Sequence, residues 1–228
     1  MVDFYNIYKH QGAMYQAMIE AEDFQQNLVR ALRAKIPNNS RNLLDLGSGT
    51  GRLPRILQHD FDSIIGLDLH RNMLLQQQAD PNLNILQADM RILPVSDSSF
   101  DVVSAGWAIG HLCGWYPQDW HEHISKVLDE MQRTCKPGGL LMIMETMSTG
   151  ALQPAPPTPW LAELYDCFVA NWGFTQKVIS TDYLFPSVMQ AKALTGFFFG
   201  EQMLEKIDQY QWQQLPEWTG IWWKRNTA

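Results

Sequence analysis

Hydrophobic positions along the chain follow two alternating periods, and this alternation indicates the fold class. Short apolar runs that are typical of buried strands are separated by segments with apolar residues at helical spacing. The predicted strands are residues 42–47, 63–69, 82–89, 100–108 and 140–147. The predicted helices are one or two over 12–36, then 51–59, 71–79 and 118–134. Alternation of this kind predicts an α/β protein with a parallel sheet and helices on both faces.

The last third of the chain departs from this pattern. Residues 148–159 are rich in Gly, Ser and Thr and contain four prolines, which suit neither a helix nor a central strand, so we expect a loop that contributes to a lid. The elements predicted beyond it are a helix at 160–173, a strand at 176–185, helices at 187–199 and 201–210, and a closing strand at 219–225. We therefore expect a seven-stranded, mostly parallel sheet whose last strand is antiparallel.

Composition and charge narrow the possible partners. The chain has 228 residues, 46% of them hydrophobic, which is enough for one full core. It carries 24 acidic against 17 basic residues and no basic run, so a nucleic-acid partner is disfavoured and a neutral or cationic partner is weakly favoured. The longest apolar runs are too short to cross a bilayer, and we expect a soluble, cytoplasmic protein without a membrane partner.

Three cysteines, Cys113, Cys135 and Cys167, lie far apart in the sequence. Their spacing matches neither a zinc site nor a redox pair, so we expect reduced thiols and no metal. The sequence gives no indication of the oligomeric state.

A glycine-rich stretch, "LLDLGSGTGRL" at 43–53, follows the first predicted strand. A loop that cradles nucleoside triphosphates needs four residues between its glycines and then Gly-Lys-Ser/Thr, whereas this chain has Gly51 followed by Arg52 and a leucine. A dinucleotide site needs its third glycine where Arg52 stands. The spacing therefore predicts a bound cofactor without a pyrophosphate. Bare backbone at Gly47, Gly49 and Gly51 would let such a ligand approach closely.

These motifs resemble the class I S-adenosylmethionine-dependent methyltransferases, and the resemblance extends to about Gly150. It rests on the glycine-rich stretch, "IIGLDL", "QADM", "FDVVSAGWAIGHL" and "CKPGGLLMI", in that order. The most similar subgroup is that of small-molecule enzymes like those of ubiquinone and menaquinone biosynthesis. The resemblance implies a Rossmann-like fold and methyl transfer to a small-molecule acceptor, with release of S-adenosylhomocysteine. It also divides a single domain, 1–228, into an N-terminal helical cap (1–40), a cofactor-binding core (41–147) and lid helices with closing strands (148–228).

The resemblance also implies roles for single residues. Asp68 would accept hydrogen bonds from both ribose hydroxyls, Asp89 would bind the adenine amino group, and Met90 would lie beside the adenine ring. Asp45 would orient the loop or receive the cofactor's ammonium group. The expected cofactor-binding residues are Asp45, Gly47, Ser48, Gly49, Gly51, Asp68, Leu69, Met73, Asp89, Met90, Ala105 and Gly106.

Structural roles compete with several of these assignments. Asp68 could be the N-cap of the following helix, and Asp89 could be a turn residue. Leu69 and Met73 could simply belong to the core. Helical spacing favours core packing for most of the aromatic residues after Trp160.

The catalytic groups are harder to identify, because methyl transfer is an in-line displacement in which positioning supplies much of the rate. His111 and Glu145 are the candidate catalytic residues, since each follows or ends a strand at the expected cleft. Their alternatives are packing for the histidine and a backbone-bonded carboxylate for Glu145. Trp107 and Trp115 are expected to line the acceptor pocket.

Other residues near the expected cleft have less specific signals. Tyr8 and Tyr15, ahead of the core, could close over the cofactor or simply pack in a helix. His121 and His123 are expected to face solvent, since residues two apart do not share a helix face.

Other functions remain compatible with the same motifs. A protein methyltransferase, a transferase that moves another group of the same cofactor, and a non-catalytic cofactor-binding regulator are the alternatives. Methylation of nucleic-acid amino groups is disfavoured, because the fourth strand reads "SAGWAIG" and lacks the Asn/Asp-Pro-Pro-aromatic signature of enzymes that hold a flipped base.

Overall fold

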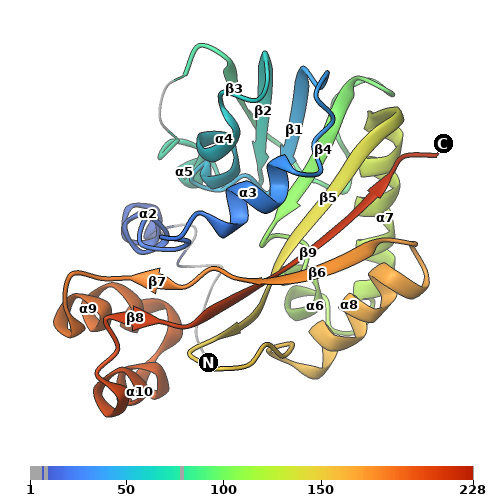
Figure 1. Cartoon of the computed structure of the whole chain (residues 1–228). Coiled ribbons are helices and arrows are strands. Elements are labelled where there is room, and N and C mark those ends of the chain that lie inside the picture. The colour runs from blue at the N-terminus through green and yellow to red at the C-terminus, as the bar shows by residue number, and fades with distance from the viewer. Residues whose placement is uncertain (1–6, 8–9, 78–79, 228) are drawn as a thin grey trace.

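The computed structural model describes residues 7, 10–77 and 80–227 (Figure 1). Tyr8 lies outside these residues. A seven-stranded sheet has the order β3-β2-β1-β4-β5-β9-β6. Its strands are β1 (Asn42–Leu46), β2 (Ser63–Asp68), β3 (Leu83–Gln87), β4 (Phe100–Gly106), β5 (Cys135–Thr149), β6 (Thr175–Ser180) and β9 (Glu217–Arg225).

The pairing of the strands confirms the predicted fold class. Strands β1 to β5 are mutually parallel, whereas β9 runs antiparallel to both of its neighbours, β5 and β6. The last strand therefore inserts between two earlier ones instead of extending the edge. Parallel strands bring their carboxyl ends to one edge of the sheet, which is where open α/β sheets bind ligands.

Alternate strand residues pack on opposite faces of the sheet. Leu43, Val102 and Met142 pack with α3 (Asn27–Arg33) and α4 (Arg52–Leu57). Their chain neighbours Leu44, Val103 and Leu141 pack on the other face, against helices α6 (His111–Trp115), α7 (Trp120–Thr134) and α8 (Pro159–Ala170). Figure 1 shows α3 and α4 in front of the sheet and α7 and α8 behind it. Both faces are thus covered, as the continuous apolar strands predict.

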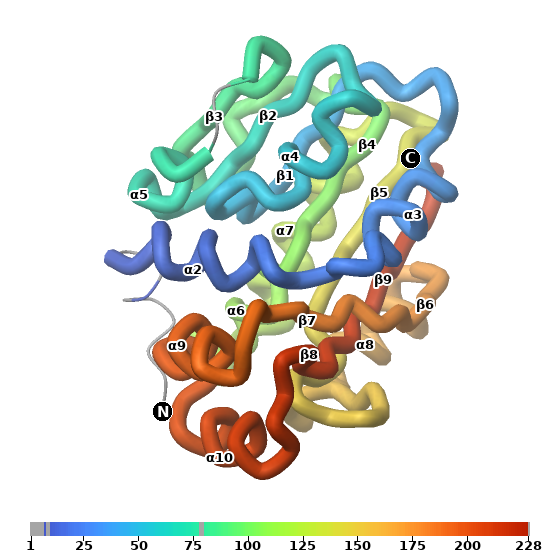
Figure 2. Tube along the Cα trace, turned by 60° about the vertical axis from the view of Figure 1, so that its left-hand side comes forward, coloured from blue at the N-terminus to red at the C-terminus, as the bar shows by residue number. Residues whose placement is uncertain are grey.

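A smaller layer lies beyond the carboxyl edge of the sheet. It consists of α2 (Gly12–Ile19), β7 (Tyr183–Leu184), α9 (Val188–Phe199), α10 (Glu201–Tyr210) and β8 (Gln214–Leu215). Apolar side chains of these elements form a core of their own, which includes Met18, Phe185 and Ile207. Figure 2 shows α2 running between the sheet edge and α9. We refer to this layer as the cap; its action as a lid stays a prediction.

The single strand predicted over 176–185 is wrong. The chain leaves β6 at Ser180 and starts β7 at Tyr183, which pairs with β8 in a separate two-stranded sheet. Asp182 causes the break, because its carboxylate accepts hydrogen bonds from Ser180 Oγ (2.8 Å) and from the backbone N–H of Glu217 (3.1 Å). These bonds tie the end of β6 to the start of β9 at the position where the strand breaks.

The long helical segment predicted over 12–36 is two helices, α2 and α3. Between them Asp23 and Gln26 adopt positive φ angles of 57° and 58°. The Asp23 carboxylate accepts a hydrogen bond from the backbone N–H of Leu28 at 3.0 Å. This turn also brings Glu22 beside Tyr183 in a single antiparallel bridge, so the N-terminal segment is tied to the cap.

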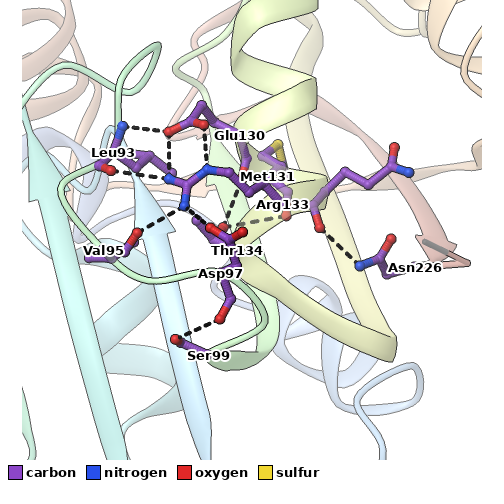
Figure 3. A network of polar contacts seen from close by, with 10 residues as sticks. Leu93, Val95, Asp97, Ser99, Glu130, Met131, Arg133, Thr134 and Asn226 are labelled. Atoms are coloured by element: carbon purple, nitrogen blue, oxygen red, sulfur yellow. Dashed lines mark hydrogen bonds and ion pairs between the residues drawn. The ribbon is translucent and has the colours of Figure 1, made fainter.

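The loop between β3 and β4 is fixed to α7 by one arginine (Figure 3). Arg133, in the last turn of α7, donates to the carbonyls of Leu93 (3.1 Å) and Val95 (3.0 Å). Glu130, one turn earlier, pairs with Arg133 at 2.6 Å and accepts from the backbone N–H of Leu93 at 2.6 Å. Residues 93–95 of this loop are therefore held against α7.

Across the described residues, every helix is too short or too polar to cross a bilayer. Cys113 and Cys135 are buried and Cys167 is partly exposed, and all three are free thiols. The expected cytoplasmic location and the division into cap, core and lid at 40 and 147 stay predictions.

Candidate functional site

A cleft that is open at its mouth lies at the carboxyl ends of β1, β2, β3 and β4. It brings together most of the residues that the sequence predicts. The predicted residues that line it are Asp45, Gly47, Ser48, Gly49, Asp68, Leu69, Met73, Asp89, Met90, Gly106, Trp107, His111 and Trp115. Gly51, Ala105 and Glu145 lie outside the described lining.

The glycine loop has a backbone conformation that residues with a Cβ rarely adopt. Gly47, Gly49 and Gly51 have φ angles of 65°, 54° and 82°, in the left-handed region that favours glycine. A Cβ at Gly47 would approach the Cβ of Ala108 to 2.3 Å, so glycine is needed there for packing. A Cβ at Gly49 would meet only the end of Met73, at 3.5 Å, so this glycine leaves bare backbone at the cleft.

Asp68, at the end of β2, anchors this loop. Its carboxylate accepts hydrogen bonds from the backbone N–H of Gly49 (2.9 Å) and of His70 (2.7 Å). His70, not Asp68, is the N-cap of the following helix α5 (Arg71–Leu74), so the capping alternative does not apply. Burial raises the pKa of Asp68, and these two hydrogen bonds oppose the rise. The remaining lone pairs can accept hydrogen bonds from a ligand.

Asp45, at the penultimate position of β1, is 1% exposed. Its carboxylate accepts a hydrogen bond from Ser104 Oγ on β4 at 2.7 Å. Burial raises the pKa of Asp45 to about 7, against the lowering effect of hydrogen bonds from Ser104 and Ser48. A carboxyl group with this pKa changes charge near neutral pH, and an approaching cation would favour its ionised form.

Asp89, just after β3, is held by Arg91. Arg91 Nε donates to both carboxylate oxygens of Asp89, and its backbone N–H donates to Oδ1 at 2.9 Å. The hydrogen bonds from this guanidinium lower the pKa of Asp89. Asp89 is therefore both a turn residue and an ionised carboxylate at the edge of the cleft.

The prediction that His123 faces solvent is wrong, whereas His121 is 61% exposed in its side chain. The His123 side chain is only 14% exposed and stacks on Tyr116, with 3.8 Å between ring centroids. Its Nδ1 lies 2.7 Å from Arg91 Nη1. A guanidinium only donates, so this nitrogen accepts. The prediction considered only the spacing of the two histidines along a helix. The contact with Arg91 holds the His123 side chain inward.

The region after β4 supplies aromatic walls. Trp107 has a positive φ of 51° and donates its backbone N–H to the carbonyl of Met144 at 2.7 Å. His111 opens α6 and stacks on Trp115, with 5.4 Å between ring centroids and 16° between planes. Burial lowers the pKa of His111 to about 4. His111 is therefore neutral at pH 7.

Glu145, on β5, binds the backbone of the turn that leads into α6. The residue is 6% exposed, and its carboxylate accepts a hydrogen bond from the backbone N–H of Gly110 at 2.8 Å, with further bonds from Ile109 and Ala108. Burial raises the pKa of Glu145 to about 7. The residue therefore orients the turn that leads into His111. A catalytic role for either residue stays a prediction.

Several residues of the cleft were absent from the predicted set. They are Ile19 on α2, Thr50, Arg52, Leu53, Leu67, His70, Ala88, Arg91, Ala108, Leu112 and Tyr116. Arg52 had a signal, because it occupies the position that a third glycine takes in dinucleotide sites. Tyr15, for which the sequence left closure over the cofactor and helix packing open, lies on α2 and lines the cleft.

Comparison with known proteins gives this site a family context. A family model described as a methyltransferase domain matches residues 44–143. The ubiquinone/menaquinone biosynthesis C-methyltransferase UbiE of Legionella pneumophila (strain Lens) is 29% identical over 141 residues, which are 58% of this chain and 50% of that protein. The chain thus spans about half the length of the curated relatives it matches.

Solved structures share the fold at low identity. Phosphoethanolamine N-methyltransferase 2 of Haemonchus contortus, in complex with S-adenosyl-L-methionine, has a TM-score of 0.61 and 18% identity, covering 97% of this chain and 60% of that chain. The cyclase SpnF has a TM-score of 0.57 and 18% identity, covering 88% and 81%. At this identity the likeness concerns the fold alone.

Proposed function

We propose that this chain, which contains a methyltransferase domain and resembles the class I S-adenosylmethionine-dependent methyltransferases, transfers a methyl group from S-adenosylmethionine to a small molecule. S-adenosylhomocysteine is then the second product. No metal is part of the proposal; the described residues contain no group of three or more His, Cys, Asp or Glu side chains suited to a metal ion.

The observation that carries the proposal is the order of side chains along the cleft. The strand order β3-β2-β1-β4 sets Asp89, Asp68, the glycine loop and Trp107 side by side. Neighbouring strands are about 4.8 Å apart, so this row covers about 14 Å. The row would bind adenine, ribose, the methionine part and the acceptor, in that order.

The residues present fit such a cofactor. Asp68 is a fixed carboxylate with remaining lone pairs, which suits two vicinal hydroxyls. Gly49 leaves backbone open to the cleft, where a larger residue would place a Cβ. Asp45 is a buried carboxyl group with a pKa of about 7, so at neutral pH it can ionise when the ammonium group of a ligand arrives.

The chain's own part in the reaction is chiefly positioning. When bound, S-adenosylmethionine supplies a methyl group on a sulfonium, which a nucleophile displaces in line. Trp107 and Trp115 line the cleft beyond the glycine loop and would hold the acceptor. His111 is neutral at pH 7, which is the state that accepts a proton from an acceptor.

Two observations favour a small-molecule acceptor. Tyr15 and Ile19 of α2 line the cleft together with the sheet edge, so α2 forms one wall and the cleft suits a compact molecule rather than a large surface. The curated relative named above carries a printed name that refers to quinone biosynthesis, and quinones are small molecules. The acceptor and its accepting atom are left open by the proposal.

A second candidate is another reaction in the same fold. The cyclase SpnF shares the architecture, so the fold by itself does not require methyl transfer. Non-catalytic binding of the cofactor and methylation of a protein are also compatible with this cleft.

Calorimetry followed by a turnover assay tests the proposal. The purified protein is titrated with S-adenosylmethionine and with S-adenosylhomocysteine, and both should bind at one site per chain. It is then incubated with S-adenosylmethionine and a panel of hydroquinones, phenols, amines and peptides, and S-adenosylhomocysteine is measured. Release with a small molecule supports the proposal. Binding without any product would favour a regulator or another reaction, and absence of binding would overturn the proposal.

A further inference from the structure

We propose that His123, while its ring is neutral, positions Arg91 and through it the carboxylate of Asp89 that would bind the adenine amino group. This inference rests on the proposed function, because it concerns binding of the same cofactor. It gives a role to a histidine that we expected to face solvent and that lies outside the described lining of the cleft. His123 is therefore a positioning residue, which acts on the ligand only through Arg91 and Asp89.

The His123 ring lies behind two residues that line the cleft. Its Nδ1 is 2.7 Å from Arg91 Nη1, and its face stacks on Tyr116 with 3.8 Å between ring centroids. Arg91 and Tyr116 both line the cleft, and the guanidinium lies over the Tyr116 ring, 4.9 Å from the centroid. The histidine thus contacts both the cation and the ring on which the cation rests.

The Arg91 guanidinium uses different N–H groups for its two polar partners. Nε and Nη2 donate to the Asp89 carboxylate, at 2.9 Å to Oδ1 and 2.5 Å to Oδ2. Nη1 donates to His123. Because a guanidinium is a rigid planar fork, a partner on a second edge prevents its rotation in the plane. The imidazole therefore fixes the edge of Arg91 that holds Asp89.

A carboxylate on the far side of the ring favours the tautomer that this contact needs. Because Nδ1 accepts from Arg91, the neutral ring carries its hydrogen on Nε2. Asp119, the N-cap residue of α7, places its Oδ2 3.4 Å from Nε2 and attracts that hydrogen. Asp119, His123, Arg91 and Asp89 therefore form a continuous row from the surface to the cleft.

Protonation of His123 breaks this row. Imidazoles take up a second proton in acid, and on His123 that proton would occupy the lone pair that accepts from Arg91. The charged ring would repel the guanidinium and be attracted to Asp119 instead. Cofactor affinity should therefore fall as the pH is lowered and the ring becomes charged. The charged and titratable groups that face the ring are Asp119 and Glu122 on α7, Arg91 and Asp89 after β3, and Tyr116 just after α6.

Two substitutions separate the acceptor from the ring. His123→Asn keeps an oxygen acceptor near the position of Nδ1 and cannot take up a proton, whereas His123→Phe keeps the stacking on Tyr116 and has no acceptor. In calorimetry at pH 8, His123→Phe should bind S-adenosylhomocysteine about threefold to fivefold less tightly than the wild type, the effect of about one hydrogen bond. His123→Asn should bind it as tightly as the wild type at pH 8. At pH 5 the wild type should bind about threefold less tightly than His123→Asn.

Other histidines near the cleft require a comparison at each pH. His70 and His111 also line the cleft, so the readout is the ratio of wild-type to variant affinity, in which their titration cancels. His121→Asn is the matched control, because His121 lies two residues earlier in α7, is 61% exposed in its side chain and pairs with Glu163. It should change the affinity at neither pH. Thermal unfolding at both pH values checks that each variant is folded, and the ratio for His123→Asn is the test where His123→Phe is not.

Two further measurements show whether His123 acts through Arg91 and Asp89. In an Arg91→Met background, His123→Phe should cause no further loss of affinity, because the residue that it positions is already gone. S-inosylhomocysteine lacks the adenine amino group, so it should bind His123→Phe and the wild type equally tightly. A residue that merely packs in the fold would not distinguish these two ligands.

The outcomes are distinguishable. Additive losses in the double variant, or an equal loss for both ligands, would make His123 a packing residue and overturn the inference. A ratio between wild type and His123→Asn that is constant from pH 5 to 8 would also overturn it. Failure of the wild type to bind S-adenosylhomocysteine at any pH would instead overturn the proposed function, and this inference with it.

Discussion

Arg91 holds both carboxylate oxygens of Asp89 through two nitrogens, with Nε at 2.9 Å from Oδ1 and Nη2 at 2.5 Å from Oδ2. The same guanidinium donates to His123 and lies over the ring of Tyr116 at 4.9 Å. The carboxylate proposed to bind the adenine amino group is thus fixed before any ligand arrives. Such preorganisation reduces the conformational cost of binding.

Arg91→Met should therefore weaken cofactor binding without unfolding the protein. The variant loses the bonds that orient Asp89, and we expect S-adenosylhomocysteine to bind about 1 kcal/mol less tightly, the scale of one hydrogen bond. Calorimetry at constant pH and salt measures this loss. Arg133→Met is the control, because Arg133 braces the same loop from α7, away from the cleft (Figure 3). It should lower thermal stability and leave the affinity unchanged; the reverse pattern would contradict the assignment.

The order of elements was predictable because each strand and helix has a strong local pattern. The apolar run around Val102 and Val103 is buried on both faces of the sheet, and such runs differ clearly from helical spacing. The predicted strand is wrong where a single side chain ends it. Asp182 interrupts a segment of good strand formers, and only its bonds to residues far along the chain show why.

The site residues that could be predicted lie in short motifs of the sequence. The glycine loop and Asp68 belong to motifs with defined spacing, and both line the cleft. For remote segments the sequence left alternatives open: Tyr15 could close over the cofactor or pack in a helix, and only the tertiary packing of α2 brings it to the cleft. The same holds for His123, whose inward position depends on Arg91, 32 residues earlier.

Gly49→Ala separates backbone strain from cofactor contact. The left-handed φ of 54° should cost about 1–2 kcal/mol of folding stability for a residue with a Cβ. The new methyl group meets the protein only at ordinary contact distance, but it occupies the surface that the cofactor would approach. We expect S-adenosylhomocysteine binding to fall at least tenfold in calorimetry, beside the modest loss of stability.

Gly138→Ala is the matched control for this variant. Gly138 has a φ of 76°, a Cβ there would meet nothing within 4 Å, and it lies outside the described lining of the cleft. Its replacement should cost a similar amount of stability and leave binding unchanged. Equal binding by the two variants would show that Gly49 is needed for the turn alone.

Asp68→Ala should weaken S-adenosylhomocysteine binding by about 1.5–3 kcal/mol, the range of charge-assisted hydrogen bonds. The loss combines the ribose contact with the anchor of Gly49. Asp101→Ala is a control of the same chemistry, since Asp101 accepts from the backbone N–H groups of Arg41 (3.0 Å) and Asn42 (2.9 Å) beside the start of β1. It should reduce stability only. Unchanged affinity in Asp68→Ala would remove Asp68 from the site.

Glu145 makes the stability of the fold depend on pH. Burial raises its pKa from 4.5 in the unfolded chain to about 7 in the folded protein, so the folded state holds its proton more tightly. The stability contributed by this group is full below pH 4.5 and is lost as pH rises through about 7. A residue that cannot ionise at this position should therefore weaken the pH dependence of the free energy of unfolding between pH 4.5 and about 7.

Glu145→Gln tests this directly, because glutamine can still accept a hydrogen bond from Gly110 and does not ionise. Urea unfolding from pH 4.5 to 8 should give a wild-type free energy of unfolding that falls relative to the variant by up to about 1.4 kcal/mol per pH unit between pH 4.5 and 7. Glu122→Gln is the control. The hydrogen bond from Lys126 lowers the pKa of Glu122 below 4.5, so its contribution is lost only below the measured range, and its curve should stay parallel to that of the wild type from pH 4.5 to 8. Parallel curves for the wild type and Glu145→Gln would show that Glu145 stays ionised in the folded protein, and that the turn before His111 is held by a charged rather than a protonated carboxyl group.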